Sequence, residues 1–144
     1  MVRFTRIDSE AQAPTRGSDL AAGWDLRALE ECVVSKGVSS RIRTGLKVAI
    51  PAGFEGQVRA RSSLGAKGLI LPNAPGTIDA DYRGELMVLM TWIGEGDSFT
   101  VSKGERVAQL VIAQVPQVTF LEVDEDGLGT TERGEGGFGS TGRF

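Results

Sequence analysis

The sequence predicts an all-β fold, and three observations carry this prediction. Short apolar runs alternate with turns, and the 144-residue chain contains 20 glycines and 5 prolines, a pattern typical of many short strands separated by turns. No long stretch repeats apolar residues at the 3.6-residue period of a helix. The length also suits one domain with a single core. Together these features favour a β-sandwich or β-barrel.

The clearest strand candidate is residues 41–50 (RIRTGLKVAI). Alternating positions share one face of a strand, and that face would carry Ile42, Thr44, Leu46, Val48 and Ile50. The alternation continues through residues 54–61. There one face would carry Phe54, Gly56, Val58 and Ala60, opposite Glu55, Gln57, Arg59 and Arg61.

Three more apolar runs complete the predicted strands. Residues 86–92 (LMVLMTW) are apolar on both sides and indicate a buried strand. Residues 107–115 and 118–123 are two further candidates, separated by Pro116. The turns and runs up to residue 123 therefore define a β-domain at residues 1–123.

Only one short segment indicates a helix. Residues 62–68 (SSLGAKG) could form one or two turns, with a serine cap before them and glycine after. Residues 124–144 differ from everything before them, because they are acidic at first, then glycine-rich, and poor in apolar side chains. Such a segment cannot bury enough apolar area to offset the entropy lost on ordering. We expect residues 124–144 to form a flexible arm.

Composition excludes several kinds of chemistry. The formal net charge of −3 argues against a nucleic-acid polymer as partner, because such binding usually requires a basic excess. The chain has no histidine and one cysteine, which excludes a Ser-His-Asp triad, a Cys-His pair and a zinc-thiolate cluster. Any catalysis must therefore depend on carboxylates, hydroxyls, arginines and oxygen-bound metals.

The expected location is the cytoplasm. Cys32 has no partner for an intramolecular disulfide, which fits a reducing compartment. The N-terminal residues contain no apolar stretch typical of a signal peptide. No run approaches the ~18 apolar residues of a membrane helix, so no membrane association is expected.

The arm contains a literal GxGxxG at Gly134–Gly139. A dinucleotide site needs a helix after this motif, and five residues follow Gly139, too few for one. A phosphate-binding Walker loop is also excluded, because no lysine follows. The arm could be a tether without a role. Arg133 and Phe138 indicate otherwise, because arginine can grip phosphate and phenylalanine can stack on a base.

Two segments in the body could carry the remaining chemistry. Arg61, Ser62 and Ser63 place a guanidinium beside two hydroxyls, which could bind phosphate; the alternative is a capped turn with a surface arginine. Residues 73–85 (NAPGTIDADYRGE) are predicted to form a hairpin.

The predicted hairpin offers Asp79 and Asp81 beside Tyr82. Its alternative is a polar tip without function. Carboxylates combined with a phosphate-binding cluster elsewhere favour hydrolysis of a phosphoanhydride by water.

Five segments resemble the five motifs of the trimeric dUTPase family, in order and at similar spacing. They are Ala22–Leu26 (AGWDL), Arg61–Gly68 (RSSLGAKG), Gly76–Leu86 (GTIDADYRGEL), Gly104–Leu110 (GERVAQL) and Arg133–Gly142 (RGEGGFGSTG). The resemblance spans residues 22–142. One departure is Trp24, where smaller or aliphatic residues are more usual; it affects no expected catalytic group.

The resemblance implies a distorted jelly-roll, β-barrel-like subunit and a homotrimer. It implies active sites shared between subunits, with the C-terminal arm of one chain closing a site on others. The implied reaction is hydrolysis of dUTP to dUMP and pyrophosphate with Mg²⁺, which limits uracil in DNA and supplies dUMP for dTMP synthesis.

The resemblance also implies roles for individual residues. Asp79 would deprotonate the water that attacks the α-phosphorus. Gln109 would lie near the phosphates and this water. Asp25 would support the metal and phosphate region without contacting the substrate directly. Magnesium would be held mainly by phosphate oxygens and waters, with no direct protein ligand expected.

The substrate-binding residues implied by the resemblance fall into three groups. The base and sugar would contact Asn73, Thr77, Ile78, Tyr82 and Met87, with Tyr82 leaving no room for a 2′-hydroxyl. The phosphates would contact Arg61, Ser62 and Ser63. The arm would contribute Arg133, Gly139, Ser140 and Thr141 to the β- and γ-phosphates, and Phe138 would stack over uracil.

Two other functions stay open. The related dCTP deaminase shares the subunit fold and an arginine-serine-serine segment, but it uses a glutamate and differs after the hairpin. Here the chain has no acid between Glu85 and Glu95. The other alternative is a non-catalytic or dual-role regulatory protein built on the same scaffold.

Overall fold

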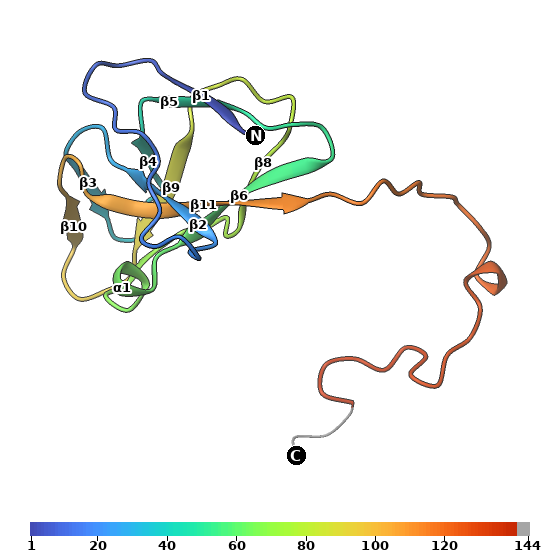
Figure 1. Ribbon diagram of the computed structural model, residues 1–144. Helices are drawn as coiled ribbons and strands as arrows, with labels where there is room; N and C mark the ends of the chain where they lie inside the picture. The colour runs from blue at the N-terminus through green and yellow to red at the C-terminus, as the bar shows by residue number, and fades with distance from the viewer. Residues whose placement is uncertain (141–144) are drawn as a thin grey trace.

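The structure is a computed structural model that describes residues 1–140. These residues form eleven strands, one short α-helix (α1, Ser62–Gly65) and one 3-10 turn (η1, Asp126–Leu128) (Figure 1). The all-β prediction is therefore confirmed. The strands are β1 (Arg3–Arg6), β2 (Gly23–Arg27), β3 (Cys32–Ser35), β4 (Ser40–Arg43), β5 (Leu46–Ala49), β6 (Phe54–Ala60), β7 (Leu69–Ile70), β8 (Gly76–Ile78), β9 (Met87–Trp92), β10 (Ser98–Val101) and β11 (Arg106–Gln114).

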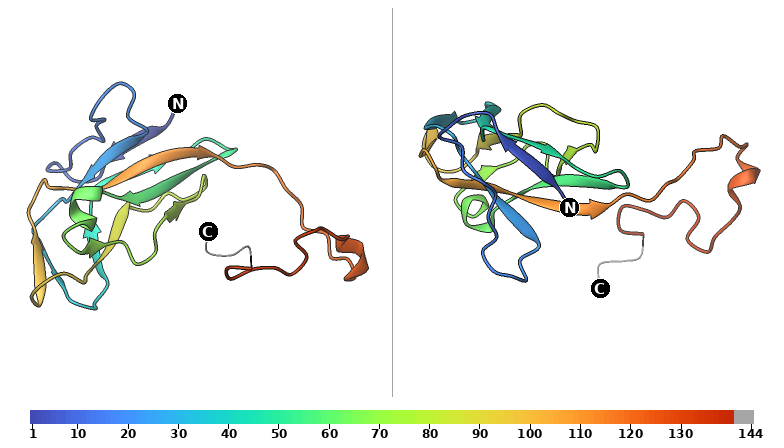
Figure 2. Two further views of the ribbon diagram at one scale, coloured as in Figure 1. Left: turned by 90° about the horizontal axis from the view of Figure 1, so that it is seen from below. Right: turned by 45° about the horizontal axis from the view of Figure 1, so that its top comes forward.

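Four small antiparallel sheets make up the body. The largest has the strand order β2-β11-β6-β8, and a second has the order β4-β9-β7. The pairs β1-β5 and β10-β3 complete the set. Figure 2 shows the long strands β6 and β11 side by side, with the C-terminal arm leaving the body from the end of β11. The arrangement is the jelly-roll-like one expected from the sequence.

The predicted alternation over residues 41–50 is confirmed in its burial but not as one strand. All five side chains of the expected inner face are buried. The strand itself breaks at Thr44 and Gly45, so that β4 pairs with β9 and β5 pairs with β1. Gly45 has a φ of +68°, which favours glycine. The break lets one alternating segment serve two sheets.

Burial departs from expectation on two other strands. On β6 only Gly56 and Val58 of the expected inner face are buried, because Phe54 and Ala60 lie at the exposed ends. The buried strand predicted at residues 86–92 is confirmed for most of its length, and the exception is Met87, which is exposed, with Leu89 half-buried. Val88 and Met90 are in the core, whereas the opposite face of β9 is more exposed and belongs to the site described below.

The short helix forms where it was predicted, but its caps differ. The residue at the N-cap is Arg61, not a serine, and no side chain caps the helix. The carbonyl of Arg61 instead accepts the amides of Leu64 and Gly65. Ala66 follows the helix, and Gly68 takes a φ of +102°. A side chain on Gly68 would lie 2.6 Å from the backbone of Gly94, so this position requires glycine.

Residues 73–85 do not form the predicted hairpin. The strand at their start, β8, pairs with β6, whereas β9 after them pairs with β4 and β7. The segment is therefore a loop that passes from one sheet to another. Turn residues alone could not reveal this, because strand partners are chosen by non-local packing.

The predicted strand at residues 118–123 is also wrong. This stretch belongs to no ladder within residues 1–140, and Val118, Phe120 and Leu121 are strongly exposed. Pro116 removes a backbone donor just before it, and the chain has already left the body. The amide of Val115 donates to the carbonyl of Gly53, and beyond it residues 116–140 are exposed nearly throughout. No helix within residues 1–140 is long and apolar enough to cross a membrane.

Candidate active site

A polar pocket of about 310 Å³ lies between β4, β9 and the loop after β8. This volume is at the lower end of the range usual for small-ligand sites. It gathers most of the residues that the resemblance assigns to base, sugar and catalysis. Its lining consists of Arg41, Thr77, Ile78, Asp79, Tyr82, Glu85, Met87 and Leu89.

The loop after β8 positions the catalytic candidate and Tyr82. Asp79 directly follows β8, and its carbonyl accepts the amide of Tyr82 at 3.1 Å, which closes a tight turn. The Tyr82 hydroxyl donates to the carbonyl of Glu85 at 3.0 Å. The ring lies across Gly84, where an added Cβ would clash with the hydroxyl oxygen. Glycine at this position is therefore what allows the ring to fold back.

Asn73 lies outside the lining of this pocket, in the loop that precedes β8. Its amide nitrogen is 3.3 Å from where a Cβ on Gly76 would stand, which places it at the start of β8. Asp79 follows the other end of that strand. A nucleotide that contacts both residues would therefore extend along β8.

A second group of candidates surrounds Asp25, which is buried on β2. The Arg106 Nη1 atom lies 3.2 Å from one carboxylate oxygen, and the Arg61 Nε atom lies 4.0 Å from the other. Arg61 also donates to the carbonyl of Arg106 at 2.7 Å. Gln109 stands directly opposite Asp25 across the β2-β11 ladder. Two guanidinium groups around one carboxylate leave a net positive charge, which suits a phosphate.

Ser62 and Ser63 extend this cationic group at the start of α1, where both are exposed. The fold therefore joins Arg61, its two serines, Asp25 and Gln109 in one region. Within residues 1–140 no three acidic, histidine or cysteine side chains gather in a group suited to a metal. Asp25 is the buried carboxylate of this region, and both of its oxygens face arginines.

The two groups lie at opposite ends of β6. Ile78 stands opposite Gly56, whereas Ser62 follows the far end of the strand. The extended chain from Gly56 to Ser62 spans about 20 Å, at roughly 3.3 Å per residue. One chain therefore does not bring its Asp79 and its own phosphate candidates together.

The arm holds the remaining candidates away from the body (Figure 1). Arg133 donates to the carbonyl of Gly136 at 2.7 Å, and the Phe138 side chain is fully exposed. Phe138 and Gly139 both have positive φ, at +49° and +91°. Ser140 is exposed, and Thr141 lies outside the described residues.

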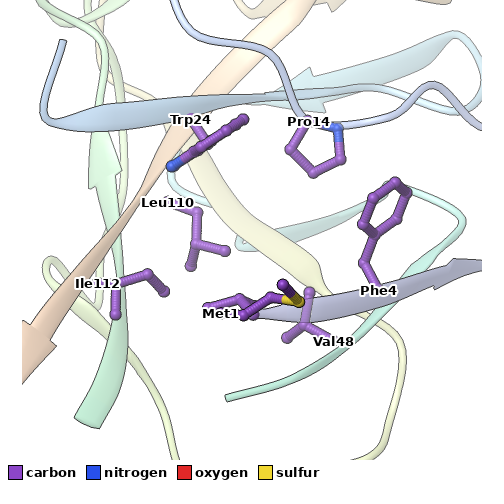
Figure 3. Close-up of a pocket in the computed structure, with 8 residues that line it drawn as sticks. Met1, Phe4, Pro14, Trp24, Val48, Leu110 and Ile112 are labelled. Carbon is purple, nitrogen blue, oxygen red and sulfur yellow. The ribbon is translucent and has the colours of Figure 1, made fainter. Parts of the chain in front are cut away.

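An apolar cavity lies in a different part of the body (Figure 3). It has a volume of about 360 Å³ and a lining from β1, β2, β5 and β11. Trp24 lies on one wall, with the Arg16 guanidinium 5.0 Å from its ring centroid. Because no charged side chain lines this cavity, it offers no group for hydrolysis. Its lining residues are Met1, Val2, Phe4, Pro14, Trp24, Val48, Leu110 and Ile112.

Sequence reasoning missed four residues of these sites: Arg106, Arg41, Glu85 and Leu89. Arg106 was inside a recognised motif, but nothing local shows that it pairs with Asp25. Arg41 and Glu85 line the polar pocket only because β4 and β9 are neighbours. Away from these sites, the Lys103 ammonium donates a hydrogen bond to the Glu10 carboxylate. This hydrogen bond, followed by the charge of Glu10, raises the pKa of Lys103.

Comparisons with known proteins identify the family. The family model described as dUTPase matches residues 9–142. The chain is 49% identical to the deoxyuridine 5′-triphosphate nucleotidohydrolase of Syntrophotalea carbinolica, over 98% of this chain and 96% of that protein. It is 47% identical to the protein of the same name from Zymomonas mobilis, over 90% of this chain and 87% of that one.

A solved structure is similar along the full length. The dUTPase of Staphylococcus bacteriophage 80alpha, a mutant in complex with dUpNHpp, aligns with a TM-score of 0.87 and 28% sequence identity, covering 99% of each chain. Sequence and structure thus lead to the same assignment. This chain belongs to the dUTPase family.

Proposed function

We propose that this chain is a dUTP diphosphatase, which hydrolyses dUTP to dUMP and pyrophosphate in sites assembled between copies of the chain. Family membership and the dUpNHpp bound by the phage relative support the substrate. The reaction limits uracil in DNA and supplies dUMP for dTMP synthesis. The cytoplasm is the proposed location.

The observation that carries the shared site is the separation of the two groups along β6. Asp79 must hold a water against the α-phosphorus, and the phosphate candidates must contact the same triphosphate. About 20 Å between them within one chain is too far for both contacts. A second copy solves the problem when its Arg61 region faces the first copy's polar pocket. A closed homotrimer repeats this contact three times.

The chemical step needs one base and one leaving group. Asp79 removes a proton from water, and the water oxygen forms a bond to the α-phosphorus. The bond from this phosphorus to the bridging oxygen breaks, and pyrophosphate leaves with the electron pair. Tyr82 packs against the deoxyribose at the 2′ position. Asn73 and the backbone of Thr77 and Ile78 bind the uracil and sugar, with Met87 nearby.

Charge on the phosphates is balanced by the region around Asp25. Arg61 and Arg106 are held by this buried carboxylate, so their guanidinium groups are oriented before the substrate arrives. The hydroxyls of Ser62 and Ser63 donate to phosphate oxygens, and Gln109 lies beside the attacking water. When bound, magnesium neutralises phosphate charge and orients the leaving group. Asp25 is buried and paired with Arg106 at 3.2 Å, so it would support the waters around the ion from behind rather than bind the ion directly.

The arm, residues 124–144, completes the site on another copy. We propose that it is flexible without substrate and closes over dUTP. Arg133 and the residues from Gly139 to Thr141 then contact the β- and γ-phosphates, and Phe138 stacks on uracil.

Pyrophosphate release from each dNTP, with and without magnesium, tests the proposed reaction. We expect dUTP to be preferred over dCTP by about 10⁴-fold, because mismatched polar groups at the base would stay unpaired. Thymine should be rejected by a close wall of the pocket against its methyl group. Comparable turnover of dTTP and dUTP contradicts this account. Ammonia released from dCTP would instead indicate the deaminase, and no release from any nucleotide would favour a regulatory protein.

Mixed assemblies test the shared site. Chains carrying Asp79→Asn and chains lacking residues 132–144 should each be inactive, whereas a reassembled mixture should recover partial activity. Recovery occurs because some sites then receive an intact base from one chain and an intact arm from another. Light scattering measures whether the assembly is a trimer, and mass spectrometry verifies mixing. Verified mixed trimers without recovery would show that each chain has a self-contained site.

A further inference from the structure

The Glu85 carboxylate joins the active-site loop to the break between β4 and β5. Its Oε1 atom accepts the Gly45 amide at 2.8 Å. The Arg43 Nε atom lies 3.3 Å and 3.2 Å from its two oxygens. The Glu85 side chain is largely buried and also lines the polar pocket. It is therefore an anchored wall of the pocket rather than a solvated surface group.

The break between β4 and β5 supplies one partner of this contact, the Gly45 amide. Gly45 has a positive φ, and its amide donates to the Glu85 carboxylate. A side chain at Gly45 would stand 2.7 Å from the Ala11 Cβ atom, so neighbouring packing fixes this backbone. The carboxylate is thus held by a rigid part of the core.

Following the chain back from β9 into the loop, Glu85 is the last residue whose side chain is held by hydrogen bonds to the core. The next residue, Leu86, is bonded on both sides: its amide donates to Leu46, and its carbonyl accepts the Thr44 hydroxyl. Toward Asp79, by contrast, residues 81–83 are exposed. The Tyr82 hydroxyl reaches from that exposed part to the carbonyl of Glu85.

We propose that Glu85 is a positioning residue that sets the dUTP-to-UTP discrimination of this enzyme. Its carboxylate, fixed by Gly45 and Arg43, holds its own carbonyl at one place. That carbonyl holds the Tyr82 hydroxyl and thereby the ring that stands against the 2′ position of the sugar. The proposal rests on the proposed function, because Tyr82 must contact the sugar.

Steady-state kinetics with dUTP and UTP test this role. Glu85→Ala should lower the ratio of kcat/KM for dUTP over UTP by about tenfold, with a higher KM for dUTP and a smaller change in kcat. Glu85→Gln should stay within about threefold of the wild type, because its amide oxygen can still accept the Gly45 amide. Glu10→Gln is the matched control: it removes an ion pair with Lys103 that contacts neither Glu85 nor Tyr82, and it should leave the ratio unchanged.

A double variant separates positioning from general damage. On a Tyr82→Phe background, Glu85→Ala should change the ratio little further, because the bond through which it acts is already missing. Arg43→Met loses only the ion pair and should lower the ratio by about threefold; it is the variant to measure if Glu85→Ala does not assemble. An unchanged ratio in either single variant, or additive effects in the double variant, would overturn the proposal. A wild-type protein that does not hydrolyse dUTP would instead refute the proposed function.

Discussion

Asp79→Asn is expected to lower the turnover of dUTP by about 10²–10⁴-fold, the usual contribution of a positioned general base. Asparagine has the shape of aspartate but cannot accept the proton from the attacking water. Binding of a non-hydrolysable dUTP analogue should stay close to that of the wild type, because the proposed role of Asp79 is to act on the water. Single-turnover rates and calorimetric titration of the analogue measure the two effects separately.

Asp81→Asn is the matched control for this prediction. Asp81 belongs to the same exposed loop, but it does not line the polar pocket. Its substitution should leave the rate near that of the wild type. A near-normal rate for Asp79→Asn together with an inactive Asp81→Asn would show that the general base is Asp81 and that the assignment to Asp79 is wrong.

Deletion of residues 132–144 should lower turnover by orders of magnitude while leaving the melting temperature almost unchanged. The described part of this segment is exposed and contributes no strand to the body, so its loss removes little packing. In the proposed mechanism, the contacts of Arg133 and Phe138 with the substrate form only when the arm closes, and closure also excludes water from the phosphates. Calorimetry of unfolding and pyrophosphate release measure the two quantities on the same sample.

Phe138→Trp provides a direct observation of closure. Indole emission should change when a slowly hydrolysed dUTP analogue binds, and the unsubstituted protein, with its own Trp24 and Trp92, corrects for background. Full activity in the truncated protein would reduce the arm to a tether. An unchanged emission on binding would show that Phe138 does not reach the base.

Local pattern predicted burial better than pairing. The inner face of residues 41–50 follows from alternation alone, because side-chain direction is a property of the strand itself. The break at Gly45 depends on which distant strands are available to β4 and β5, and no local signal states this. The same reason explains the failure at residues 118–123, where a suitable apolar pattern has no partner within the described chain.

The site could be predicted as far as its motifs reached. Asp79 and Tyr82 share one short loop, so their proximity follows from the sequence. The contact of Arg106 with Asp25 joins residues 81 positions apart, and it exists only because β2 and β11 are neighbours. The contact of the Tyr82 hydroxyl with the Glu85 carbonyl likewise depends on the absence of a side chain at Gly84 and on the hydrogen bond from the Gly45 amide to Glu85.

The separation of the two half-sites along β6 has a genetic consequence. If the chain forms the proposed trimer, a faulty chain in a cell with two alleles enters mixed trimers at random. If the fault lies in Asp79 alone, each faulty chain disables one site, so activity falls in direct proportion to its share. If one allele carries faults in both Asp79 and Arg61, each active site needs two sound chains, and activity falls with the square of the sound fraction. Allele dosage would thus distinguish a protein that damages one half-site from one that damages both.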